Sequence, residues 1–365
     1  MRVMIATAGH SPDDDDLFHR MTRSLLDAGH RVLMVTRGQT ATAPELDGFQ
    51  HVNFPDQPVT DFGRALEQLA REWQPEALQV REFELLAAAG RIRKAHGIPV
   101  IYNVGDHHRE MYATFSSKPP VIKQLINWGL VRFERTLLKH ADVVTAASTT
   151  IEERYRSWGC KTVPVFNYPR HRDMETDTDK EPLVIYHGQL SIERGVGTLV
   201  NAFVEVIRRR PEARLEIYGS ERVPGTLSQL REAVRQSGLE GSITVSPAIA
   251  RQQVLARLGK AAIGVIPFHN KPLFRVAPPN KLYEYYACWC AVVCSDLPVL
   301  RVIARDAARF VPPGDAPALA DAISSLLSDD QDRLQLARRG RELVENEYRW
   351  DLVEDNYLNI FREPA

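Results

Sequence analysis

Short apolar segments alternate with amphipathic segments along almost the whole chain of 365 residues. Runs that are apolar on both faces are typical of buried parallel strands, and the helices between them cover the sheet. The pattern therefore predicts an α/β protein, independently of any motif. In the first half we expect a helix over 17–28 and strands over 2–8, 31–36, 77–80, 99–104 and 141–146, the last closing that half.

The alternation stops once, at the polar and charged stretch 170–182, and then restarts. Such a stretch is typical of a linker, so we expect two doubly wound domains, 1–170 and 183–348, joined by a linker at 171–182. Ligands bind at the carboxyl ends of parallel strands, which predicts a site in the cleft between two facing domains. The expected strands of the second half are 183–186, 214–218, 243–245, 262–267, 291–294 and 309–311, with helices at 198–209 and 226–237 and a broken helical segment over 316–361.

The composition narrows the class of protein further. Lys and Arg total 46 against 47 Asp and Glu, and this balance argues against a nucleic-acid partner. The longest apolar runs, such as 261–268, are far shorter than the roughly 20 residues that span a bilayer. The N-terminus lacks the layout of a signal peptide, and four cysteines do not make a disulfide framework. We therefore expect a cytoplasmic α/β enzyme.

The segment 183–203, LVIYHGQLSIERGVGTLVNAF, is expected to form a strand, a loop and the start of a helix. A strand–loop–helix of this kind presents free backbone N–H groups and the positive end of a helix dipole to an anion. Arg194 lies just before that helix, where it is placed to pair with a diphosphate. An ordinary turn with a solvated arginine would show the same local pattern.

A second segment, 262–296, contains a buried strand, a Pro-rich loop and a helix that begins near Asn280. Asn280 is a good helix cap, and Glu284 lies on the same helical face. A carboxylate there suits a bidentate hydrogen bond to two neighbouring hydroxyls, as in a ribose, and Lys281 would meet a phosphate. The alternative is a capped helix with a Lys–Glu pair on its surface.

These segments resemble the family 4 glycosyltransferases of the GT-B fold. The resemblance covers nearly the whole chain and is densest over 183–320. It is carried by YHGQLSIERGVGTLVNAF, LEIYGS, PNKLYEYYACWCAVVCSDLP and VPPGDAPALADAI in the second half, and by GHSPDDDDLFHRMTRSLLDAGHRVLMVTR, HADVVTAAS and VFNYP in the first. The ending YRWD resembles the final helix that in this family returns to the first domain, so a helix over about 349–361 is expected to pack there.

The resemblance implies two Rossmann-like domains facing across a cleft. It also implies transfer of a sugar, with retention at the anomeric carbon, from a nucleoside diphosphate donor to a glycan, lipid-linked or small-molecule acceptor. UDP or GDP is the expected nucleotide, and no bound cofactor or metal is expected. Polysaccharide or glycoconjugate biosynthesis is the corresponding process.

Segment 183–203 departs from the family pattern in the basic residues that would bind the diphosphate. An Arg–Lys pair commonly holds the diphosphate in this family, but Gln189 stands at the Arg position and Arg194 at the Lys position. One cation is lost, and Lys281 or Arg275 is expected to replace it. By resemblance, Gly188 lies against the same diphosphate.

A second departure lies eight residues before Glu284, where the family often has another glutamate. Val276 occupies that position. Glu284 would therefore bind the ribose, while the contact to the donor sugar would come from backbone or another side chain of the loop that contains Arg275, Val276 and Asn280.

In the first half, an expected strand runs into Gly105, Asp106, His107 and His108. Related enzymes often place a histidine at the position of Gly105, so His107 or His108, beside Asp106, would have to serve as the catalytic group. A histidine there takes an acceptor proton or supports the donor sugar. A pair of surface histidines capping the next helix is the alternative.

Four consecutive aspartates, 13–16, follow Gly9 and His10. The run contains the Asp-x-Asp spacing of metal-dependent transferases, but those enzymes have one sheet domain with the motif deeper in the chain. Acidic residues are also favoured in the first turn of a helix. We therefore expect no metal, and by resemblance to a GT-B subgroup the loop with Gly9, His10 and Asp14 would face the acceptor.

The segment 118–139 has five basic residues and one acid, with Trp128 and Phe133 among aliphatic residues. This pattern is consistent with docking on an anionic membrane, where lipid-linked acceptors are found. A helix that covers a sheet and keeps its charges in water would show it too.

Two other functions stay open at the level of sequence. Val276 and Gln189 are consistent with a non-catalytic homologue that binds nucleotide sugar or serves as a partner subunit. A GT-B epimerase or an inverting transferase would need an acid–base set that the motifs do not reveal.

Overall fold

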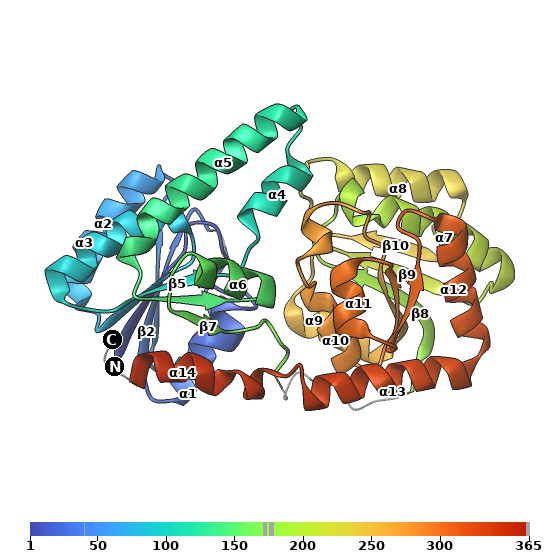
Figure 1. Cartoon of the computed structure of the whole chain (residues 1–365). Coiled ribbons are helices and arrows are strands. Elements are labelled where there is room, and N and C mark those ends of the chain that lie inside the picture. Colours follow the sequence, from blue (N-terminus) through green and yellow to red (C-terminus); the bar gives the residue numbers. More distant parts are fainter. Residues whose placement is uncertain (40, 171–173, 175–178, 363–365) are drawn as a thin grey trace. The chain divides into compact units, whose positions relative to one another are not determined.

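The computed structural model describes residues 1–39, 41–170, 174 and 179–362. The chain divides into two compact units, each built on one parallel sheet (Figure 1). Unit 1 contains Met1–Asn167 and the chain from Trp350 onward, and unit 2 contains Tyr168–Arg349. The prediction of an α/β protein with two Rossmann-like sheets is confirmed.

Unit 1 has a seven-stranded sheet of order β3-β2-β1-β4-β5-β6-β7. Its strands are β1 (Arg2–Ala6), β2 (Arg31–Arg37), β3 (Phe49–Phe54), β4 (Ala77–Val80), β5 (Val100–Val104), β6 (Val143–Ala146) and β7 (Thr162–Pro164). Its helices are the π-helix η1 (Leu17–Thr22), α1 (Arg23–Asp27), α2 (Val59–Trp73), η2 (Phe83–Leu85), α3 (Leu86–His96), α4 (His108–Phe115), α5 (Pro120–Leu137), η3 (Leu138–His140), α6 (Thr149–Ser157), η7 (Trp350–Leu352) and α14 (Glu354–Arg362).

Both edge strands of this sheet are missing from the sequence-based prediction. β3 is partly exposed, so polar residues such as Gln50 and Asn53 interrupt its apolar pattern. β7 has three residues and ends in Pro164, a residue that sheets tolerate at an edge. The expectation that 141–146 closes the first half is therefore wrong, because β7 pairs with β6 beyond it.

Unit 2 has a six-stranded sheet of order β10-β9-β8-β11-β12-β13. Its strands are β8 (Glu181–His187), β9 (Arg214–Tyr218), β10 (Ile243–Ser246), β11 (Ala261–Ile266), β12 (Ala291–Ser295) and β13 (Ala308–Val311). Its helices are η5 (Ile192–Arg194), α7 (Val196–Arg209), α8 (Thr226–Ser237), α9 (Arg251–Lys260), η6 (Leu273–Arg275), α10 (Asn280–Ala287), α11 (Pro298–Ala304), α12 (Ala316–Ser328) and α13 (Asp330–Asn346). Most of the expected linker lies outside the described residues, and β8 begins before that linker was expected to end.

The last helix, α14, belongs to unit 1 (Figure 1). Trp350 and Tyr357 are fully buried there. The indole Nε1 of Trp350 donates to Ser24 Oγ at 2.9 Å, and Tyr357 Oη donates to Gln79 Oε1 at 2.8 Å. The indole N–H and the phenol hydroxyl are thus both hydrogen-bonded, so the C-terminal segment is an integral part of the unit 1 core.

Helix α10 is seated on unit 2 by two tyrosine rings that lie against glycines. A Cβ at Gly264 of β11 would come within 2.4 Å of the Tyr285 ring, and one at Gly340 of α13 within 2.1 Å of the Tyr286 ring. Both tyrosines are fully buried, and Tyr286 Oη donates to Ala307 O at 3.2 Å. Because no side chain stands between ring and backbone, the depth of α10 on the sheet is fixed.

Candidate functional site

The carboxyl end of β8 in unit 2 meets the first turn of α10. Gly188 has φ 109°, in the region that favours glycine, and a Cβ there would lie 3.2 Å from Lys281 Nζ. Lys281 Nζ also lies 3.6 Å from the centroid of the Tyr186 ring, a cation–π contact. The structure therefore brings the predicted residues Gly188 and Lys281 together.

Lys281 is only 6% exposed, and its Nζ has no hydrogen-bond partner among the described residues. Burial, reinforced by the charge of Arg194, lowers the pKa of the Lys281 ammonium well below its usual value. A buried cation without a hydrogen-bonding partner costs free energy. An arrangement of this kind suits an anionic ligand, and it differs from the surface Lys–Glu pair considered as the alternative.

Arg194 ends η5, immediately before α7. Its guanidinium carbon lies 5.5 Å from the centroid of the Phe268 ring and 5.4 Å from that of Phe274. Arg194 Nη2 donates to Gln189 Oε1 at 3.3 Å. Two aromatic rings and an amide thus hold this second cation at the start of a helix, next to Lys281, where an anion is favoured.

Glu284 lies one turn after Lys281 and is equally buried. Its Oε2 is 3.3 Å from His187 Nε2, and its Oε1 accepts from Arg251 Nη1 at 3.5 Å. Burial, with Lys281 and Arg251 nearby, lowers the pKa of His187 to about 3, so the ring is neutral at ordinary pH. Sequence reasoning missed His187, although it precedes Gly188, and missed Arg251, whose own segment gives no signal.

One detail of the donor loop corrects a sequence-based expectation. Asn280 is the first residue of α10 and does not cap it: Pro279 occupies the cap position with φ −82° and ψ 126°. A proline fixed in that conformation leaves the following residue inside the helix. Arg275 Nη1 donates to Asn270 Oδ1 of its own loop at 3.1 Å, and Val276 follows η6.

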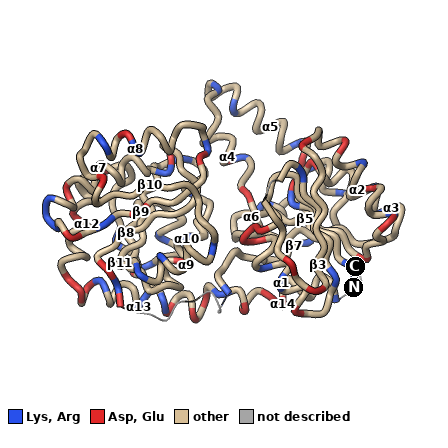
Figure 2. The backbone as a smooth tube through the Cα atoms, turned by 180° about the vertical axis from the view of Figure 1, so that it is seen from behind, with Lys and Arg blue, Asp and Glu red and all other residues tan. Residues whose placement is uncertain are grey.

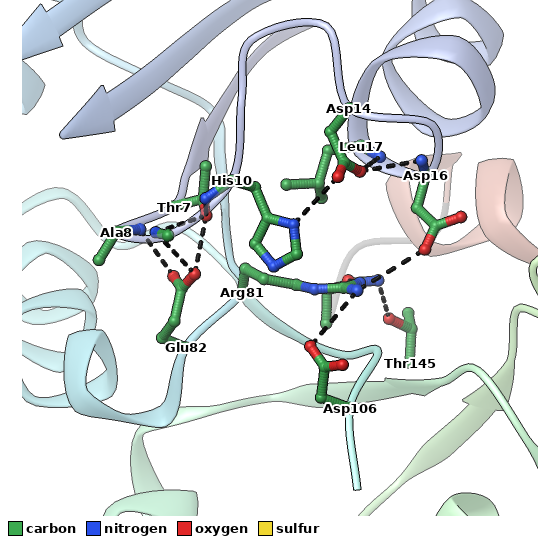
Figure 3. A network of polar contacts seen from close by, with 12 residues as sticks. Thr7, Ala8, His10, Asp14, Asp16, Leu17, Arg81, Glu82, Asp106 and Thr145 are labelled. Carbon is green, nitrogen blue, oxygen red and sulfur yellow. Dashed lines mark hydrogen bonds and ion pairs between the residues drawn. The ribbon is translucent and has the colours of Figure 1, made fainter. Parts of the chain in front are cut away.

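In unit 1, the loop that follows β1 is held by one carboxylate (Figure 3). Glu82 Oε2 accepts from the backbone N–H of Ala8 at 2.8 Å, and its Oε1 accepts from Gly9 N at 3.2 Å and from Thr7 Oγ1 at 2.8 Å. This bonding fixes the path of the chain into His10.

His10 and Asp14 form a pair in the same loop (Figure 3). His10 Nδ1 lies 3.0 Å from Asp14 Oδ2, while Asp14 Oδ1 accepts from the backbone N–H groups of Asp16 and Leu17 at 2.9 Å each. Burial opposes charge on the ring, but the hydrogen bond to Asp14 and the charges of Asp14 and Glu82 together outweigh it and raise the pKa of His10. The pair therefore presents an oriented imidazole at the carboxyl end of β1.

The aspartate run makes ion pairs within the protein. The side chain of Asp16 pairs with Arg20 in the interior, and Asp14 is bound by His10. Within the described ranges, no group of three or more His, Cys, Asp or Glu side chains is arranged to hold a metal ion.

Arg81 explains why position 105 is a glycine. The Arg81 side chain is almost fully buried, donates to Asn103 Oδ1, and has Nη2 at 3.7 Å from Asp16 Oδ2 and 3.9 Å from Asp106 Oδ2 (Figure 3). A Cβ at Gly105 would lie 1.7 Å from Arg81 Nη2. The guanidinium thus fills the space that any side chain at 105 would need, and sequence reasoning missed this residue.

The two histidines that follow lie in different environments. His107 is 3% exposed, its Nε2 lies 3.1 Å from Ser148 Oγ, and burial lowers its pKa to about 4. His108 is half-buried, and its ring packs edge-on against Phe83 at 5.6 Å between centroids. His107 is therefore an interior residue at the N-terminal cap position of α4, unlike the surface histidine considered as the alternative.

Helix α5 presents many large apolar side chains to solvent. Val121, Leu125 and Trp128 are 68%, 65% and 67% exposed, and Ile122, Ile126 and Phe133 are also exposed. Figure 2 shows basic residues along the same helix, and Arg132 lies over the Trp128 ring at 5.9 Å. Among the helices the structure describes, none combines the length and the apolar character needed to cross a membrane.

Each unit thus carries polar or charged side chains at the carboxyl ends of parallel strands, and unit 2 places the buried Lys281 beside Gly188, with the half-buried Arg194 near it. These features define an α/β protein of the class that binds phosphate-bearing nucleotides. The chain matches the family models "Glycosyl transferase 4-like domain" over residues 17–169 and "Glycosyl transferases group 1" over 181–329. It belongs to the family 4 glycosyltransferases of the GT-B fold.

Curated relatives are distant. The chain is 23% identical over 291 residues to the GDP-mannose-dependent monoacylated alpha-(1-6)-phosphatidylinositol monomannoside mannosyltransferase of Corynebacterium glutamicum, covering 79% of this chain and 74% of that protein. It is 24% identical over 187 residues to the alpha-D-kanosaminyltransferase of Streptomyces kanamyceticus, covering 51% of this chain and 46% of the relative. The chain therefore spans about half the length of that kanosaminyltransferase.

Solved structures share the fold over the whole chain. Sucrose-phosphate synthase from Thermosynechococcus elongatus superposes with a TM-score of 0.76 at 18% identity, covering 98% of both chains. Anabaena HepE in complex with UDP and glucose gives a TM-score of 0.76 at 13% identity, covering 99% of both. At such identities the likeness shows the GT-B fold alone.

Proposed function

We propose that the chain is a retaining glycosyltransferase that moves a sugar from a nucleoside diphosphate to a glycan, lipid-linked or small-molecule acceptor. The observation that carries the proposal is the buried Lys281 ammonium, which lacks a hydrogen-bond partner in the described structure and lies against Gly188. Arg194 is beside it and Glu284 one turn further on, a set that suits a diphosphate and a ribose. UDP and GDP are the proposed nucleotides, since HepE was solved with UDP and the mannosyltransferase relative is named GDP-mannose-dependent.

The proposed chemistry is front-face displacement. The bond between the anomeric carbon and the diphosphate breaks with its electron pair passing to the diphosphate. The acceptor oxygen bonds to the same face of that carbon, and its proton goes to a diphosphate oxygen. Lys281 and Arg194 stabilise the charge that develops on the leaving group, as positioned cations do.

We assign acceptor-side roles in unit 1 to the loop with Gly9, His10 and Asp14, and to Asp106 and His108. His10 is oriented by Asp14, and Asp106 is 40% exposed beside Arg81. His107 is buried against Ser148, so its proposed role is to hold the start of α4 rather than to act on substrate.

The donor site is tested by calorimetric titration of UDP, GDP, ADP and TDP and of their sugar conjugates into the wild-type protein and Glu284→Gln. We expect one nucleotide to bind wild type and to bind the variant about 10- to 100-fold more weakly, because hydrogen bonds to a charged group are lost. Arg208→Gln, an exposed surface change in the same unit, is the control. Equal affinities in wild type and Glu284→Gln would contradict the ribose assignment.

Product analysis then separates the functions that remain open. For a retaining enzyme, the anomeric proton couplings of the product should show the same anomeric configuration as the donor sugar. Inverted product would point to an inverting transferase, conversion of the donor sugar without an acceptor to an epimerase, and tight binding without turnover to a non-catalytic homologue.

We further propose that α5 docks unit 1 on an anionic membrane surface, on the cytoplasmic side. Val121, Leu125 and Trp128 follow one another at helical spacing and are largely exposed. Arg132 and Arg135 recur on the same side, so apolar burial and attraction to anionic headgroups act together.

Replacing Val121, Leu125 and Trp128 together with serine is expected to lower binding to vesicles rich in phosphatidylglycerol by at least about tenfold, since each buried apolar side chain contributes on the order of 1.5–3 kcal/mol. Co-sedimentation measures it. Val302→Ser, at an exposed apolar residue of unit 2, is the matched control. Unchanged binding by the triple variant, or equal binding of wild type to neutral phosphatidylcholine vesicles, would refute the docking proposal.

A further inference from the structure

We infer that Arg222 supplies a guanidinium to the donor diphosphate site, in place of the family arginine that is missing at position 189. The inference rests on the proposed function and adds a residue to the same site. Its starting point is the Gln189 carboxamide: Oε1 accepts from Arg194 Nη2 at 3.3 Å and from Arg222 Nη1 at 3.4 Å.

The backbone places Arg222 beside Gln189. β8 and β9 are parallel neighbours, and the loops after them continue to pair: Leu190 N donates to Ser220 O at 2.8 Å, and Arg222 N donates to Leu190 O at 3.1 Å. A Cβ at Gly219 would lie 1.8 Å from Gly188 O, so the two loops touch at backbone level. Residues 33 positions apart in sequence are thereby held in register.

The charges favour an anion at this point. Two guanidinium groups share one neutral oxygen, and the ammonium of Lys281 lies near enough to Arg194 for each to feel the other's charge. Like charges held together are unfavourable unless an anion lies among them. A nucleoside diphosphate sugar carries phosphate charges that suit the guanidinium groups on either side of Gln189, and the Gln189 amide N–H groups add neutral donors.

The geometry also explains glutamine at 189. An arginine at position 189 would bring its guanidinium against the guanidinium groups of Arg194 and Arg222. Three positive charges would then meet where the Gln189 Oε1 atom now accepts two hydrogen bonds. Glutamine at 189 and arginine at 222 therefore form a matched pair: the cation is moved from the β8 loop to the β9 loop, and the amide links it to Arg194.

A swap experiment tests this relocation. Dissociation constants for UDP, GDP and inorganic pyrophosphate are measured by calorimetry on wild type, Arg222→Gln, Gln189→Arg and the double variant. We expect Arg222→Gln to weaken binding of the preferred nucleotide by about 10- to 100-fold, the range for one charge-assisted contact. The double variant should recover most of that loss, which a merely structural arginine would not allow. Arg208→Gln is the control for loss of a surface charge.

The outcomes separate the two proposals. If Arg222→Gln binds as tightly as wild type while Lys281→Met does not bind, the Arg222 inference is wrong and the donor site stands. If the double variant is no better than Arg222→Gln, the relocation is wrong. Wild-type protein that binds none of the three probes would overturn both the inference and the proposed function.

Discussion

Replacing Lys281 with methionine is expected to raise the unfolding temperature of the ligand-free protein and to abolish its stabilisation by nucleoside diphosphate. The ammonium is buried and has no hydrogen-bond partner in the described part of the chain. Methionine keeps an unbranched apolar stem against the Tyr186 and Phe268 rings without that charge. We expect a gain of about 1–3 kcal/mol in the free energy of unfolding, within the range for removing a poorly paired buried charge.

The pH dependence follows from the depressed pKa of Lys281, whose main cause is burial. Between that pKa and the ordinary lysine value of about 10.4, the unfolded chain binds more protons than the folded one. The contribution of Lys281 to stability therefore improves as pH rises through this window, and the advantage of the methionine variant shrinks. Nucleotide binding needs the charged form, so its affinity in wild type falls as pH rises through the same pKa.

Urea unfolding of wild type and Lys281→Met at several pH values measures the difference in stability and its dependence on pH. Calorimetry in buffers of different ionisation enthalpy measures the proton taken up when nucleotide binds wild type. A methionine variant that is less stable than wild type, or that binds UDP or GDP with unchanged affinity, would show that Lys281 is an ordinary packing residue.

The donor-site residues proposed from sequence share one property: they lie in two short segments with strong local patterns. Gly188, Gln189 and Arg194 follow one buried strand, and Lys281 and Glu284 open one helix. The parallel sheet joins the two segments because β8 and β11 are neighbours. A pattern of strand, turn and helix start is therefore sufficient to select these proposed donor-site residues, which the sheet then brings to neighbouring positions.

The residues that sequence reasoning missed come from segments with no such pattern. Arg222 reaches Gln189 from the neighbouring loop, and Arg251 reaches Glu284 from the start of α9. Arg81 fills the space beside Gly105, 24 positions later in sequence, and only the register of β4 with β5 reveals it. Each depends on which strands are neighbours, which a single sequence does not state.

The pairing of strands also explains which strands the sequence-based prediction missed. The central strands are apolar on both faces and were found to within a few residues. The edge strands β3 and β7 pair on one side only and carry polar or proline residues. In unit 1, a prediction based on continuous apolar runs therefore recognises the middle of the sheet and misses its edges. In unit 2 the edge strands β10 and β13 carry enough apolar residues to be predicted.

Substituting Gly264 with alanine is expected to destabilise unit 2 and to weaken nucleotide binding, although residue 264 touches no proposed ligand group. The new methyl would lie 2.4 Å from the Tyr285 ring. That ring is fully buried, and its hydroxyl donates to Val265 O at 3.3 Å, so it has little room to move. Overpacking of this kind costs about 1–3 kcal/mol.

The Tyr285 ring can move away from the new methyl group only if α10 shifts, and α10 also carries the buried Lys281 and Glu284. Urea unfolding and calorimetry on Gly264→Ala should therefore show lower stability together with weaker binding. Gly241→Ala, at a glycine of unit 2 with open space around it, is the matched control and should change neither. In the double variant with Tyr285→Leu, the smaller side chain removes the clash, so the two changes should be less than additive. Additive losses of stability and binding would mean that Gly264 does not act through the packing of the Tyr285 ring, and hence of α10, against β11.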